Sequence, residues 1–126
     1  MRRLLIAVSL LLLVLCGTWL STNHLGTLTG QMSTLLTRAE ALGESGDWEN
    51  ALSLTQQAES IWTDHELYFH ILLRHSDTDD ITYSFREVKE FLRCQEGGEY
   101  SAANSVLIGR IYLLYEQERC NLKNLF

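Results

Sequence analysis

The chain lacks proline, lacks any sustained alternation of apolar and polar residues, and lacks a cluster of basic residues. The absence of proline excludes collagen-like and proline-rich classes and leaves long helices uninterrupted. Lys and Arg number 10 against 16 Asp and Glu, which gives a formal net charge of −6. Nucleic-acid binders carry a clustered basic face, so nucleic acid is excluded as the expected partner. The 126 residues suffice for one domain and leave no room for a second.

An apolar stretch, residues 4–20, carries no charge and follows Arg2 and Arg3. As a helix its 17 residues reach about 26 Å, slightly less than the ~30 Å hydrocarbon core of a bilayer. Residues 21–23 can extend that helix into the interface, and Trp19 stands where an aromatic belt residue belongs. We therefore predict that residues 1–20 are an N-terminal membrane anchor (a signal-anchor) and that residues 4–20 contact the membrane.

The charges around this stretch predict its orientation. After Arg2 and Arg3 the next basic residue is Arg38, so the positive-inside rule keeps the N-terminus in the cytoplasm. Residues 21–126 then form an extracytoplasmic domain of a single-pass cell-membrane protein. An alternative is a cleaved, secreted protein, because a signal peptidase site near Gly17 would leave a chain that begins at Thr18.

Apolar residues recur at steps of three and four along the rest of the chain, as on the buried face of helices. The first such stripe, Leu25 to Leu42, continues the anchor as one rod. Further helices are predicted from Trp48 to about His75, around Ile81–Leu92 and around Ala103–Tyr115. The sequence therefore predicts an all-α fold, in which an N-terminal transmembrane helix is followed by about four antiparallel helices arranged as two αα-hairpins.

Two similar turns support this layout. Gly46–Ala51 (GDWENA) is matched 52 residues later by Gly98–Ala103 (GEYSAA). In each segment a glycine ends one helix, an aromatic residue enters the next, and an alanine three residues on allows close approach. The turn resembles that of a tetratricopeptide repeat, although the likeness covers little beyond the turn.

The whole layout resembles a bacterial domain-of-unknown-function family, number 4363, of small N-terminally anchored helical proteins of Gram-positive bacteria. The likeness rests on the basic start, the anchor and a series of short motifs: Gly46–Ala51, then Trp62, His65 and Tyr68, then His75, Asp77, Asp79, Asp80 and Ile81, and finally Asn124-Leu125. The resemblance implies an anchored helical domain and no activity.

Three histidines, His65, His70 and His75, are candidate metal ligands. His65 to His70 looks like the zinc-protease motif H-E-x-x-H with one residue too many. Five positions turn a regular helix by about 500°, which leaves the two rings some 140° apart and unable to share a metal. We therefore predict no metal, no cofactor and no catalytic residue. Glu66 and His70, at i and i+4, are expected to make a helix-stabilising contact.

Three surfaces are predicted partner contacts. Asp77, Asp79 and Asp80 are expected in a polar turn between helices, with Asp77 or Asp79 as a helix N-cap. Phe69 is expected off the apolar face, as an exposed aromatic edge. The apolar C-terminal tail supplies the rest of the predicted contacts, Leu122, Leu125 and Phe126.

Cys94 and Cys120 could form a disulfide outside the cytoplasm, although an antiparallel hairpin would place one near the turn and the other at the far end. The sequence leaves that pairing open.

These observations together predict a non-catalytic, membrane-anchored interaction or accessory subunit at the cell envelope, whose partner is a membrane or envelope protein. Alternatively, the partner is a second copy of this chain, in a homo-oligomer. The main competing function is a metal-dependent or hydrolytic envelope enzyme that uses His65, His70 and His75 with Asp79.

Overall fold

The computed structural model describes residues 1–72 and 75–125, without the side chains of residues 21, 22, 72, 75, 118 and 121–125. All regular secondary structure in these residues is helical, which confirms the predicted all-α fold. The helices are α1 (Arg2–Glu44), α2 (Trp48–Asp64), α3 (Glu66–Leu72), α4 (His75–Arg93) and α5 (Gly97–Leu125).

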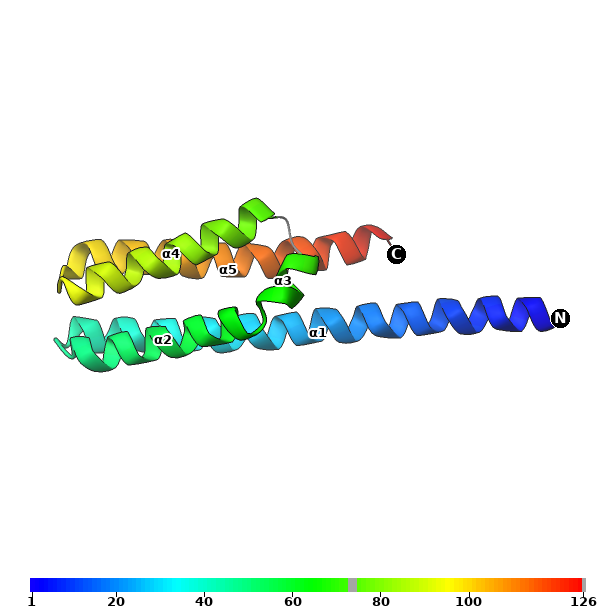
Figure 1. Ribbon diagram of the computed structural model, residues 1–126, viewed down its shortest axis with the longest axis horizontal. Coiled ribbons are helices and arrows are strands. Elements are labelled where there is room, and N and C mark those ends of the chain that lie inside the picture. Colours follow the sequence, from blue (N-terminus) through cyan, green and yellow to red (C-terminus); the bar gives the residue numbers. More distant parts are fainter. Residues whose placement is uncertain (73–74, 126) are drawn as a thin grey trace.

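Helix α1 is one continuous rod of 43 residues, about 65 Å long. Its first half projects beyond the other helices, and its second half packs among them (Figure 1). Residues 4–14 and Leu20 are exposed, whereas Leu25 and Leu28 are buried. The predicted rod from the apolar stretch into the domain is therefore confirmed.

Four long helices run antiparallel in succession, as in an up-and-down bundle. Helix α1 packs against α2 and α5, and α4 packs against α2 and α5. The α1–α2 and α4–α5 turns lie at the end away from the N-terminus, while α3 and the end of α5 lie on the side of the apolar stretch (Figure 1). This arrangement confirms the two predicted αα-hairpins.

The two similar turns pack against each other. The Asp47 side chain accepts a hydrogen bond from the backbone N–H of Asn50 at 3.3 Å and so caps α2. The rings of Trp48 and Tyr100, which follow the two turns, meet edge to face at 6.3 Å. A Cβ on Gly43 would lie 2.9 Å from the Tyr100 ring, so the absence of a side chain there permits this contact. The repeated turn therefore joins the two hairpins at one end.

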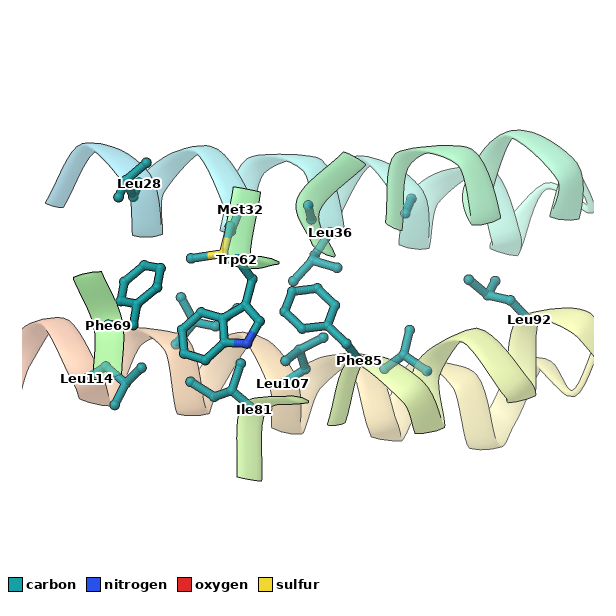
Figure 2. Close-up of a cluster of buried hydrophobic side chains, with 14 of the residues drawn as sticks. Leu28, Met32, Leu36, Trp62, Phe69, Ile81, Phe85, Leu92, Leu107 and Leu114 are labelled. Atoms are coloured by element: carbon teal, nitrogen blue, oxygen red, sulfur yellow. The ribbon is translucent and has the colours of Figure 1, made fainter. Parts of the chain in front are cut away.

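The hydrophobic core is centred on Trp62, which lies between α1 and the α4–α5 hairpin (Figure 2). Its ring stacks on Phe69 at 4.4 Å, and its indole N–H donates to the Thr82 hydroxyl at 3.0 Å. Most predicted apolar positions are buried, among them Leu25, Met32, Leu36, Ile81, Phe85, Val88, Leu107 and Ile111. Helical periodicity therefore identified most of this core.

The prediction of one helix from Trp48 to His75 was wrong, because α2 ends at Asp64 and α3 begins at Glu66. Leu67 and Ile71 are 75% and 74% exposed, whereas Phe69 is fully buried. The break at His65 separates α3 from the helical phase of α2, and α3 places the Phe69 ring on that of Trp62. The exposed aromatic edge predicted at Phe69 is therefore absent.

A buried polar group ties α5 to α1. The Asn104 side-chain amide, fully buried, donates to the Leu36 carbonyl at 3.1 Å and to a Glu40 carboxylate oxygen at 3.3 Å. The Ser101 hydroxyl donates to the other Glu40 oxygen at 2.6 Å. Such directional bonds disfavour sliding of one helix along the other, because a shifted register would leave buried polar groups unpaired.

Tyr100 makes the stability of the bundle sensitive to alkaline pH. Burial, helped by the negative charge of Glu40, raises the pKa of Tyr100 from 10.0 to about 12. The unfolded chain thus releases the phenol proton near pH 10 and the folded chain only near pH 12. This contribution to stability is present below pH 10 and is lost as the pH rises through 12. We expect a loss of up to roughly 3 kcal/mol from this group.

Chemical denaturation of the full chain in neutral detergent between pH 9 and 12 measures that loss. Tyr100→Phe should flatten the decline in unfolding free energy, whereas Tyr112→Phe, at a 58% exposed ring, should leave it unchanged. Parallel curves for the wild type and Tyr100→Phe would contradict this assignment.

Candidate functional site

The acidic run Asp77–Asp80 lies inside helix α4, so the predicted inter-helix turn was wrong. The helix begins at His75, and Asp77 stands in its first turn, where a carboxylate is favoured by the helix dipole. Thr78 is buried at 2% exposure and continues the spacing of three and four residues that leads to Ile81 and Phe85. The burial of Thr78 on the same face as Ile81 and Phe85 therefore extends the helix through the polar run. Asp79 and Asp80 are exposed on its surface.

A groove follows the outer side of the α4–α5 hairpin. One hollow of about 190 Å³ is lined by residues that include Asp77, Asp80 and Leu113. A second, of about 320 Å³, is lined by residues that include Phe91 and Val106. Arg110 lines both hollows and, through its hydrogen bonds to α4, lies between them; we call the two hollows together the α4–α5 groove. Two of the predicted contact residues, Asp77 and Asp80, therefore border a groove, and Asp79 does not line it.

Val106, an apolar residue of the predicted helix around Ala103–Tyr115, is 50% exposed in this groove. Leu113 is 56% exposed. Val106 and Leu113 both line the groove from α5. They are seven residues apart, which is nearly two turns, so they lie almost in line along the helix. The sequence did not predict this surface, because spacing alone cannot distinguish an apolar helix residue in the core from one that no neighbouring helix covers.

The structure describes only the backbone of two of the three predicted contact residues at the C-terminus. Helix α5 continues to Leu125, so Leu122 and Leu125 belong to a helix rather than to a separate tail. Their side chains, and the whole of Phe126, lie outside the described residues.

His65 and His70 point to different neighbours. His65 Nδ1 lies 2.9 Å from the Ile61 carbonyl, and its ring lies 5.6 Å from that of His24. His70 Nε2 lies 3.3 Å from a Glu66 carboxylate oxygen, which confirms the expected i, i+4 contact. No group of three metal-ligating side chains occurs among the residues that the structure describes, a range that leaves out the His75 side chain.

The proximity of His24 to His65 and Tyr68 was not predicted. The His24 and Tyr68 rings meet edge to face at 5.4 Å. His24 in α1 and His65 at the end of α2 lie at similar distances from the α1–α2 turn. Antiparallel register was therefore the available signal, but it requires the pairing of these two helices to be known.

The α4–α5 hairpin keeps the cysteines apart. Cys94 lies in the turn between the two helices, and Cys120 lies near the far end of α5, about 35 Å along the helix axis. Both are exposed and free. A disulfide between them within one chain is incompatible with this geometry, because bridged residues have Cα atoms within about 7 Å of each other.

Comparison with known proteins supports the resemblance noted from the sequence. No curated protein and no solved structure matches the chain. A family model described as a domain of unknown function, DUF4363, matches residues 19–125, which cover the whole four-helix bundle. The chain therefore belongs to the DUF4363 family of domains of unknown function.

Proposed function

We propose that this protein is a single-pass membrane protein that holds an acidic helical bundle outside the cytoplasm as a non-catalytic accessory subunit. One observation carries the proposal: the same uninterrupted helix, α1, supplies both an exposed apolar half and a wall of the bundle core. An exposed apolar surface of this size is unusual on a soluble protein and is typical of a segment that contacts lipid or protein.

The length of α1 supports the anchoring role. It is long and apolar enough to cross a membrane, and its most apolar part is not buried in the bundle. Only five positions separate Leu20, at the end of the apolar stretch, from the buried Leu25, about 7 Å along the helix. The bundle would therefore stand at the membrane, and the end of α5, which continues to Leu125 beyond the contact of Tyr115 with Gly26, would reach the level of the apolar stretch. A partner in the same membrane would meet it at a raised effective concentration.

The arrangement of the histidines favours a binding role over the competing enzyme. His65 faces His24, and His70 contacts Glu66, so these two do not converge on one point. A metal held by both of these histidines would need such convergence. Replacing His65 and His70 together with alanine should therefore leave partner binding intact.

Isolation of the intact protein from membranes in mild detergent tests the accessory role. We expect one membrane or envelope protein to co-purify in near-equal amount. A lone protein or a homo-oligomer would contradict the role of an accessory subunit. The mass of the isolated chain would also show whether it begins at Met1 or, after cleavage, at Thr18.

Labelling of cysteine tests the orientation. Cys94 is exposed at the end of the bundle that lies away from the apolar stretch. We expect a membrane-impermeant maleimide to label it in intact cells, because the positive-inside rule sends the bundle outside. The measurement uses a chain in which Cys16 and Cys120 are replaced by serine, and Cys94→Ser in that background is the control. Labelling only after permeabilisation would reverse the proposed orientation.

A further inference from the structure

The α4–α5 groove has an apolar floor that the described residues leave uncovered. Phe91 and Ala103 are partly buried along it, and Val106 and Leu113 are 50% and 56% exposed. The lining on α5 extends from Glu99 to Gln117, about 27 Å of helix. That length matches a partner helix of about 18 residues.

The groove is strongly acidic. Four of its lining residues are carboxylates: Asp77, Asp80, Glu87 and Glu99. None of them forms an ion pair among the residues that the structure describes, whereas Glu59 and Glu90 on the same bundle do. Arg110, the one basic residue among the described residues that line the groove, donates to the Ser84 hydroxyl and, at 3.3 Å, to the Asp80 backbone carbonyl. The groove therefore has negative charge available for a cationic partner.

The opposite side of the bundle differs in charge. The described residues that line a hollow between α1 and α2 are all uncharged, among them Gly30, Thr34 and Ile61. The Thr34 hydroxyl there donates to the Gly30 carbonyl of its own helix at 2.9 Å. Apolar surface together with unpaired negative charge is thus a property of the α4–α5 side.

We propose that the α4–α5 groove binds a basic amphipathic helix of a partner protein, whose apolar stripe covers Val106 and Leu113 and whose Lys or Arg side chains face the four carboxylates. Apolar contact supplies the buried area, and charge complementarity orients the helix. A second copy of this chain would bring like charge, since residues 21–126 hold 8 basic and 16 acidic side chains. An anionic lipid surface is repelled in the same way.

The inference rests on the proposed accessory role, because it names the surface by which such a subunit holds its partner. The probe is a fluorescent 18-residue synthetic helix with leucine along one face and lysine on both sides of it. Anisotropy is measured against the full chain in neutral detergent micelles, and protein-free micelles give the background. A second peptide with glutamate in place of lysine tests the charge requirement.

Two variants with equal changes of net charge are compared. The groove variant carries Asp80→Asn, Glu87→Gln and Glu99→Gln, and the control variant carries Glu44→Gln, Glu49→Gln and Asp64→Asn at exposed positions of the α1–α2 side. We expect the groove variant to bind the lysine peptide at least about tenfold more weakly and the control to change less than about twofold. Leu113→Ser tests the apolar floor and should also weaken binding. Circular dichroism verifies that each variant is folded.

Equal weakening in both triple variants would overturn the inference, because attraction would then be general. Tight binding of the glutamate peptide, or unchanged binding by the groove variant, would also overturn it. The two proposals fail separately. If the membrane partner co-purifies equally with the groove variant, the groove inference is lost and the accessory role stands. If the lysine peptide binds in the groove but no partner co-purifies, the accessory role is lost.

Discussion

A chain in which Leu11 and Leu12 are both replaced by lysine is expected to leave the membrane fraction and appear in the soluble fraction. Each lysine near the centre of a spanning helix costs roughly 2.5–3.5 kcal/mol of insertion free energy. Two of them oppose insertion by about 6 kcal/mol, which is more than about 10⁴ in the insertion equilibrium. Fractionation followed by a carbonate wash and immunoblotting measures the change.

The released chain should keep its bundle, because every buried apolar side chain of α1 among the described residues lies at Leu25 or beyond. Circular dichroism of the soluble form checks this point. The matched control carries Gln31→Lys and Thr37→Lys, which add the same charge at exposed positions of α1 outside the apolar stretch. That control should stay in the membrane. If the Leu11 and Leu12 variant also resisted the wash, residues 4–20 would not be the anchor.

Trp62→Ala is expected to cause the largest loss of stability from a single substitution in the bundle, about 3–5 kcal/mol. Trp62 is 3% exposed, stacks on Phe69 and donates to Thr82, so it joins α2 to α3 and α4. Alanine removes the whole indole and leaves a cavity between these helices. At the few degrees per kcal/mol typical of domains of this size, the thermal midpoint should fall by roughly 15 °C or more.

Thermal unfolding by circular dichroism in detergent measures this shift. Thr82→Val removes the hydroxyl that accepts from the indole and donates to the Thr78 carbonyl at 3.0 Å. This loss should cost about 1–3 kcal/mol, which separates the hydrogen bonds from the packing. Trp19→Ala is the matched tryptophan control, since Trp19 is 62% exposed and lies outside the bundle. Equal midpoints for Trp62→Ala and Trp19→Ala would show that the core is not centred where the structure places it.

Local properties of the chain were enough to predict most of the helices. Three local features predicted them: the charge-free stretch 4–20, the apolar spacing from Leu25 to Leu42, and the glycines at the two turns. Each depends on residues that are near one another in the sequence. Steric and hydrogen-bond preferences over such short distances are the same in any fold. The long rod of α1, the two hairpins and most of the core were therefore predictable. The C-terminal contacts at Leu122, Leu125 and Phe126 remain predictions.

The candidate site depended on contacts between residues far apart in the sequence. Phe69 is buried because the second hairpin covers it, and Val106 is exposed because none of the described helices covers it. Asp77 and Asp80 border a groove only because α5 lies beside α4. A residue's side of a helix follows from its spacing, but which sides face a neighbour is decided when four helices exclude water together. That is why periodicity identified the helices of this bundle, and only their packing identified its uncovered surface.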